Sequence, residues 1–158
     1  MKKIGEYTTR GLVTETQVID GRPAKIPLFD GSFETAYKVT AFYVWGTDWS
    51  AASGPDVIGK LSKNDDGTVG QADFMRADDG NQIAWAGSSG GADTPGVVFN
   101  NFIIDPENLV VEDLYVYARS TNATQSDPIN YMVIMEKYEI SDWKGALTMA
   151  QDRAQGDL

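Results

Sequence analysis

The sequence predicts one all-β domain, a β-sandwich of jelly-roll type, with a short α-helix at its C-terminal end. Three observations predict this fold. Short runs rich in β-branched and aromatic residues alternate with turn dipeptides along most of the chain. The 16 glycines exceed the average share, which favours many turns. Only after residue 140 does the apolar period lengthen from that of a strand to that of a helix.

The 158 residues are enough for one hydrophobic core and too few to make two domains the expectation. We predict an N-terminal arm over residues 1–10, a β-sandwich domain over residues 11–140, and a C-terminal helix and tail over residues 141–158. The arm is predicted because the first ten residues are polar and have no apolar period.

The body is predicted as a series of strands joined by tight turns such as Asp20-Gly21 and Asp30-Gly31. Pro27 has no amide proton to donate, so its strand is expected at an edge or at a bulge. The strands are expected at 12–19, 24–29, 37–45, 57–62, 74–77, 83–86, 97–104, 109–119 and 129–140.

The segment 37–45 is the strongest strand, and it is apolar on both faces. Such a strand either lies in the centre of a packed sandwich or covers a partner subunit with its outer side. Alternation places Phe42 and Val44 on one face; the other face carries Val39, Ala41, Tyr43 and Trp45.

The segment 109–119 alternates as well, and we expect it to pair with 129–140 across the polar loop between them. Leu114, Val116 and Ala118 are predicted to point inward. Tyr115 and Tyr117 are then predicted to point outward, together with Asp113 and Arg119.

The C-terminal helix is predicted to begin at Ser141, which can cap it, with Asp142 in the first turn. One stripe of this helix is apolar: Trp143, Leu147, Ala150 and Ala154. A helix this short is marginal in water alone. The stripe therefore packs either on its own sandwich or on a neighbouring subunit.

Composition excludes several classes of function. The net charge of −10, from 13 Lys and Arg against 23 Asp and Glu, repels nucleic-acid phosphates, so we expect no nucleic-acid partner. The chain contains no cysteine and no histidine, which removes thiolate and Ser-His-Asp catalysis and most zinc, copper and haem sites. The basic start lacks the apolar stretch of a signal peptide, and no run is long enough to span a bilayer. We predict no cofactor, no metal and no membrane partner.

Three motifs could carry chemistry, but a simpler interpretation explains each. Residues 64–67 and 78–81 contain oxygen ligands for calcium without the spacing of an EF-hand, and turn chemistry accounts for both. Glu112 and Asp113 could be the carboxylates of a glycosidase, yet neighbours on a strand point to opposite faces. Residues 88–91 lack a histidine base and the lysine of a phosphate loop. We predict no catalytic residue.

Aromatic residues suggest a second type of site. Flat rings on a β-sandwich can form a stacking platform for sugars, and the candidates are Trp45, Trp49, Trp85, Tyr115 and Tyr117. The alternative is that Trp45 and Trp85 fill the core and the tyrosines pair across strands. Trp49 lies in a polar loop, where an exposed ring would mark a contact surface.

Several segments together are typical of one group of proteins: residues 6–11, 26–33, 82–86 and 108–117, and the stretch from Glu136-Lys137-Tyr138 to Ala146-Leu147. Over these segments the chain resembles a group of small proteins encoded by marine tailed bacteriophages. The resemblance implies a virion structural protein that contacts copies of itself and other virion proteins, such as major capsid or tail proteins, and forms a homo-oligomer. Candidate interface residues are Tyr7, Arg10, Trp49, Tyr115, Tyr117, Trp143 and Leu147.

Overall fold

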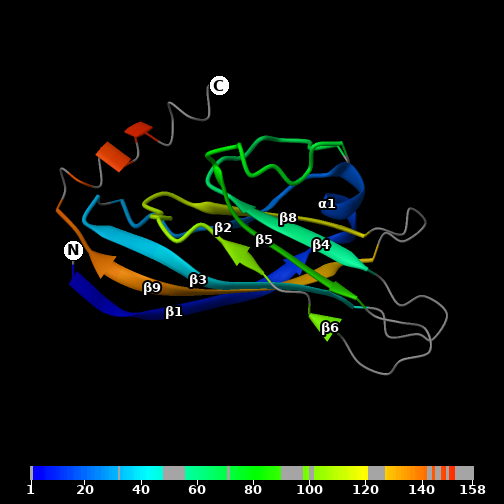
Figure 1. Ribbon diagram of the computed structural model, residues 1–158, viewed down its shortest axis with the longest axis horizontal. Helices are drawn as coiled ribbons and strands as arrows, with labels where there is room; N and C mark the ends of the chain where they lie inside the picture. Colours follow the sequence, from blue (N-terminus) through cyan, green and yellow to red (C-terminus); the bar gives the residue numbers. More distant parts are fainter. Residues whose placement is uncertain are drawn as a thin grey trace.

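The chain forms two antiparallel β-sheets packed face to face (Figure 1). The computed structural model describes residues 2–31, 33–47, 56–70, 72–89, 98–99, 102–120 and 127–141, together with 144, 147–148 and 150–151. The prediction of an all-β sandwich is confirmed over these residues. The jelly-roll connectivity remains a prediction.

The first sheet has three long strands in the order β1-β9-β3. They are β1 (Lys2–Val13), β9 (Ile129–Glu139) and β3 (Thr35–Gly46). Both outer strands pair with β9, so Val13 and Gly46 each lie opposite Ile129. We call this layer the three-stranded sheet; it is the lower layer in Figure 1.

The second layer is a six-stranded sheet in the order β2-β8-β4-β5-β6, with β7 also paired to β5. Its strands are β2 (Ala24–Ile26), β4 (Val57–Ser62), β5 (Gln82–Ser89), β6 (Val98–Phe99), β7 (Ile103–Ile104) and β8 (Leu114–Ser120). The strand that ends just before Pro27, β2, lies at an edge of this sheet, as the missing amide proton of Pro27 predicts.

The core lies between the sheets and holds side chains from nearly every strand. Phe42, Val44 and Val133 of the three-stranded sheet are fully buried against Leu61 and Leu114 of the six-stranded sheet. The predicted inward set on β8 is confirmed, because Leu114, Val116 and Ala118 are all buried. Gly59 marks a close approach of the layers, since a Cβ there would lie 2.6 Å from Val44 Cγ1.

A β-bulge changes the faces of β3. Its register with β9 shifts between Val39 and Ala41, so Val39 and Phe42 both enter the core although three positions separate them. The prediction that Val39 shares a face with Tyr43 and Trp45 is therefore wrong. Tyr43 and Trp45 alternate with Phe42 and Val44 and lie on the outer face of the three-stranded sheet.

The predicted N-terminal arm is instead a strand. Residues 2–10 belong to β1, which pairs with β9 from Lys2 to Val13 with one register shift between Lys3 and Gly5. Most of its side chains are exposed, so the segment shows no apolar period. Backbone hydrogen bonds to β9 hold residues 2–10 in place, and such bonds leave no pattern of apolar and polar residues in the sequence.

The strand predicted at 12–19 ends at Val13, and a helix, α1 (Glu15–Asp20), follows. Its start is a capping box: Gln17 N–H donates to Thr14 Oγ1 at 3.3 Å, and Thr14 N–H donates to Gln17 Oε1 at 2.9 Å. Gly21 ends the helix with φ 68°. These local bonds outweigh the β-branched composition of the segment.

Three further strand predictions need correction. β8 and β9 do not pair, because they lie in different sheets and β9 sits between β1 and β3. The segment 74–77 is not a strand. The segment 97–104 holds two short strands, β6 and β7, and not one continuous strand.

The C-terminal helix remains a prediction. Lys144, Leu147, Thr148, Ala150 and Gln151 have helical backbone. The amide of Lys144 donates to Ser141 Oγ at 3.3 Å, which fits the predicted cap. Trp143 and Ala154 of the predicted stripe lie outside the described residues.

Candidate functional site

The outer face of the three-stranded sheet carries a patch of apolar side chains. Met132 and Ile134 alternate along β9 with Val133, which points into the core, so both point outward. The register places Tyr43 opposite Met132 and Ala41 opposite Ile134. We call this patch the apolar face; it consists of Leu12, Ala41, Tyr43, Trp45, Met132 and Ile134.

Aromatic rings extend the apolar face past the edge of the sheet. Phe99 and Phe102 stand edge-on to Tyr43, with ring centroids 5.7 and 5.3 Å from it. The ring centroid of Phe99 also lies 5.9 Å from that of Trp45. Phe99 is 47% exposed, so the apolar surface continues onto β6. Ile103, which is 65% exposed, pairs with Trp85 and therefore lies on the outer side of the six-stranded sheet.

The opposite end of the same outer face is charged. Lys3 Nζ lies 3.2 Å from Glu6 and 3.4 Å from Glu136, and Tyr138 Oη donates to Glu136 at 2.5 Å. The hydrogen bond from Tyr138, followed by the charge of Lys3, lowers the pKa of Glu136. The outer face is thus divided into a charged end and an apolar end.

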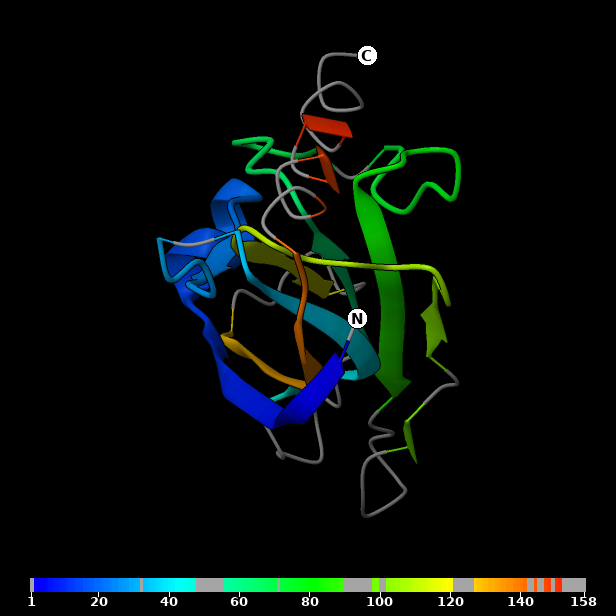
Figure 2. The ribbon, with the colours of Figure 1, turned by 90° about the vertical axis from the view of Figure 1, so that its left-hand side faces the viewer.

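Strand β1 forms one edge of the three-stranded sheet. In the described part of the chain it pairs with β9 alone, so the backbone groups along its other edge have no strand partner there. Figure 2 shows it as the blue ribbon at the margin of the molecule. Ile4, Tyr7 and Leu12 are each between 44% and 49% exposed. A long edge with exposed apolar side chains is a template for strand addition.

The predicted interface residues do not form a single site. Tyr7 and Arg10 are both exposed on β1, where the Tyr7 ring lies 6.0 Å from Tyr37. Leu147 is 44% exposed near the C-terminus. Tyr115 lies on the six-stranded sheet. Trp49 and Trp143 lie outside the described residues.

Tyr117 is not an interface residue, because it is only 1% exposed. Its outward side is covered by the segment 63–81, where Asp66 N–H donates to Tyr117 Oη at 2.8 Å. Lys60 is buried beside it, with Nζ 5.0 Å from the centroid of Tyr117 and 4.8 Å from that of Phe74. Burial lowers the pKa of Lys60 and raises that of Tyr117. We call Lys60, Phe74 and Tyr117 the lysine cage.

The predicted sugar platform is divided between the two sheets. Trp45 belongs to the apolar face, whereas Trp85 lies on the outer side of the six-stranded sheet, opposite Lys60 in register. Both tryptophans are partly exposed, so neither fills the core. Trp85 Nε1 donates to Gln82 Oε1 at 2.9 Å.

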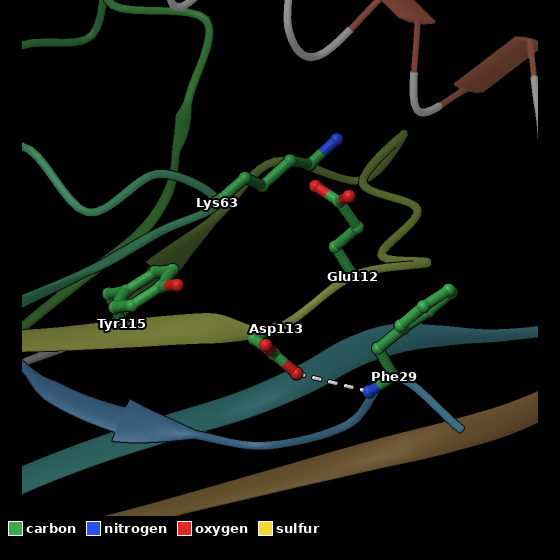
Figure 3. A pocket seen from close by; sticks show the side chains of 5 residues that line it. All are labelled: Phe29, Lys63, Glu112, Asp113 and Tyr115. Atoms are coloured by element: carbon green, nitrogen blue, oxygen red, sulfur yellow. Dashed lines mark hydrogen bonds between the residues drawn. The ribbon is translucent and has the colours of Figure 1, made fainter. Parts of the chain in front are cut away.

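A shallow pocket of about 160 Å³ lies beside Tyr115 (Figure 3). It is lined by Phe29, Lys63, Glu112, Asp113 and Tyr115. Asp113 and Glu112 both face it, which corrects the expectation that these neighbours point to opposite faces. The reason is that β8 begins only at Leu114, so strand alternation does not apply to them.

Asp113 has a structural role at the pocket wall. Its Oδ1 accepts hydrogen bonds from the amides of Leu28 at 2.9 Å and Phe29 at 3.1 Å, and Lys25 lies 3.3 Å from Oδ2. Burial opposes ionisation, but the two amides and Lys25 outweigh it and lower the pKa of Asp113. This carboxylate ties the chain after β2 to the start of β8.

The two acidic loops show turn geometry. Asp65 Oδ1 accepts from the amide of Gly67 at 2.9 Å, and Asp79 Oδ1 accepts from the amide of Asn81 at 3.0 Å. Over the described residues, no three Asp, Glu, His or Cys side chains are grouped to hold a metal ion. The described helical residues include no segment long and apolar enough to cross a bilayer.

Comparisons with known proteins found no counterpart. No family model, no curated protein and no solved structure matches this chain.

Proposed function

We propose that this protein is a non-enzymatic structural component of a bacteriophage virion that assembles in many copies, as a head decoration or minor capsid protein or in association with the tail. The observation that carries the proposal is the apolar face and its extension onto Phe99 of β6. The virion location rests on the resemblance to small proteins of marine tailed phages.

A partly exposed apolar sheet face is unusual for a protein that acts alone. Antiparallel sheets that face water on one side normally alternate apolar and polar side chains. Here the solvent side of the sheet carries Tyr43, Trp45 and Met132, and exposed Phe99 lies against the first two. Contiguous apolar surface of this kind marks contact sites between proteins.

The charge distribution supports the same proposal. The chain carries a net charge of −10, so copies repel each other wherever acidic surfaces meet. On the apolar end of the outer face, Arg10 is the charged neighbour of Met132, and it is basic. Contact through this end therefore avoids the repulsion between acidic surfaces and favours one orientation over others.

Two finer features belong to this proposal. The sandwich is of jelly-roll type, and a C-terminal helix carrying Trp143 and Leu147 adds contact area between subunits. Both are common devices of proteins that assemble by many modest interfaces.

The test combines localisation with assembly in solution. Cryo-electron microscopy of particles that encode the protein should show it in regular copies on the head or tail. Ile134→Glu and Met132→Glu place charge on the apolar face and should reduce incorporation into particles, while the circular-dichroism spectrum stays unchanged. Ile19→Glu is the matched control, because Ile19 is 60% exposed on α1 and outside the apolar face. Unchanged incorporation of both face variants would reject the apolar face as the contact surface.

A second candidate function is carbohydrate or receptor binding, and the pocket beside Tyr115 favours it. Phe29 and Tyr115 offer rings, and Glu112, Asp113 and Lys63 offer polar groups around one small opening. Glycan screening by tryptophan fluorescence tests it. A strictly monomeric protein that responds to a glycan, and loses the response in Tyr115→Ala, would favour this function over assembly.

A further inference from the structure

We propose that two copies of this chain join through their β1 edges, antiparallel about a two-fold axis at Thr8, to form one continuous sheet in the order β3-β9-β1-β1′-β9′-β3′. This inference rests on the proposed assembly function and adds a contact between the β1 edges of two copies to the contact through the apolar face. It follows from the unpaired edge of β1, its exposure and the order of charges along it.

The edge of β1 meets the geometric requirement for adding a strand. The strand is regular from Gly5 to Val13, since its register shift lies between Lys3 and Gly5. The residues from Gly5 to Leu12 are exposed or partly exposed, and in the described part of the chain no strand pairs with their outer edge. Antiparallel addition satisfies the backbone amides and carbonyls that point away from β9.

Backbone geometry limits the register to a few choices. Along a strand, alternate residues direct their amide and carbonyl groups to one neighbour and the others to the opposite side. Two β1 strands can therefore pair only in registers that place odd residues opposite odd residues and even opposite even. One residue then lies opposite its own copy, and the two-fold axis passes between the two. The residue at the axis can be Glu6, Tyr7, Thr8 or Thr9.

Charge selects among these registers. An axis at Thr8 places Glu6 opposite the partner's Arg10, and symmetry repeats this pair. An axis at Glu6 places two glutamates together and sets Lys2 against the partner's Arg10. Axes at Tyr7 or Thr9 leave Glu6 opposite Thr8 or Leu12 of the partner subunit. The Thr8 register is the one of the four that pairs unlike charges directly.

In the Thr8 register, the paired side chains lie on the same face of the sheet, and apolar residues are placed near apolar residues. Glu6 and Arg10 lie on the outer face, since their partners on β9, Glu136 and Met132, alternate with the buried Val133 and Met135. Glu6 contacts Lys3, but its side chain stays 73% exposed. Beyond the regular part, exposed Leu12 approaches the partner's Ile4.

The proposed contact joins the outer faces of the two three-stranded sheets into one surface, because β1 becomes internal. Ile134, the register partner of Thr8, lies nearest the axis in each copy, and the apolar end of one copy lies beside the charged end of the other. A contact made of one strand pair is small compared with stable protein interfaces. We therefore expect a weak dimer in solution that becomes fully populated at the high local concentration of an assembly.

The first experiment uses charge reversal in the full chain. Sedimentation velocity from about 10 µM to about 1 mM should show reversible dimers of the wild-type protein. Glu6→Arg and Arg10→Glu each create two like-charge pairs, so each should raise the dissociation constant about tenfold or more. A mixture of the two variants restores both unlike pairs, so it should dimerise like the wild type. Arg22→Glu, an exposed change outside β1, should have no effect.

The second experiment tests the register directly. The chain has no cysteine, so Thr8→Cys introduces a single thiol. At the axis it faces its own copy, so mild oxidation should link most of the protein into dimers. Thr16→Cys on α1 should link far less at the same concentration.

The inference is overturned by a wild-type protein that stays monomeric at about 1 mM, the highest concentration of the sedimentation series. It is equally overturned by a dimer that ignores both charge reversals, or by Thr8→Cys linking no faster than Thr16→Cys. The assembly function is judged separately, by microscopy of particles. A monomer found in particles rejects the β1 contact alone, whereas a register-specific dimer absent from particles rejects the virion function alone.

Discussion

The outer faces of the two sheets differ in what covers them. On the six-stranded sheet, the segment 63–81 folds over Tyr117 and Lys60 and buries both. On the three-stranded sheet, Tyr43, Trp45 and Met132 stay partly exposed. The chain thus completes one face with its own residues and leaves the other apolar. The difference teaches that a loop of the same chain can cover an outer sheet face, and that the described residues provide such a loop for the six-stranded sheet only over Tyr117 and Lys60.

The largest expected effect is a difference in the free energy of unfolding between variants of the two outer faces. Tyr117→Ala removes a buried ring and the acceptor for the Asp66 amide, so it should lower the free energy of unfolding by about 3–5 kcal/mol. Tyr43→Ala removes a partly exposed ring and should cost the monomer about 1–2 kcal/mol. Urea unfolding followed by circular dichroism measures both. Equal losses would contradict the division into a covered and an uncovered face.

The lysine cage should make the covered face sensitive to pH. Burial lowers the pKa of Lys60 in the folded state, so between that pKa and the unfolded value of 10.5 the unfolded chain binds more protons. Stability from this group should therefore rise with pH over that window and be lowest below it. Lys60→Met keeps the length of the side chain and should flatten the rise. Urea midpoints between about pH 7 and pH 9 test this, before tyrosines ionise. An unchanged slope in Lys60→Met would assign the rise to other groups.

The smallest effect is expected at the charged end of the uncovered face. The hydrogen bond from Tyr138 holds the pKa of Glu136 below its usual value, so Tyr138→Phe should move that pKa up towards 4.5. Because the folded pKa is depressed, the stabilisation is present above the unfolded pKa and is lost as the pH falls through the folded value. NMR titration of the Glu136 carboxyl carbon measures the shift. A pKa that does not move would leave Lys3 as the group responsible.

The strands of the core were predictable from sequence because a strand with one buried face has an apolar residue at every second position. Leu114, Val116 and Ala118 follow the expected pattern, and so do Phe42 and Val44. The bulge at residues 39–41 was not predictable in this way, since one additional residue exchanges the faces without altering the composition.

Other features depend on interactions that hydropathy does not record. β1 is held by hydrogen bonds to β9, which lies at the other end of the chain. Tyr117 looks like an outward residue by alternation and is buried only because a distant loop covers it. The helix α1 did leave a signal, the spacing of Thr14 and Gln17, which matches a capping box. Of the candidate site, the shared face of Ala41, Tyr43 and Trp45 could be predicted from sequence, but the addition of Met132 and Ile134 to it required the sheet register.

The position of β9 has a consequence for folding. The first strand, β1, and the third, β3, do not pair with each other in the described part of the chain; both pair with β9, which follows them in sequence. The three-stranded sheet must therefore wait until residues 129–139 have left the ribosome, and such long-range pairing is slow. A nascent chain cannot present either an ordered β1 edge or an ordered apolar face. Any association through this edge or this face therefore requires a chain in which β9 has already been made and paired.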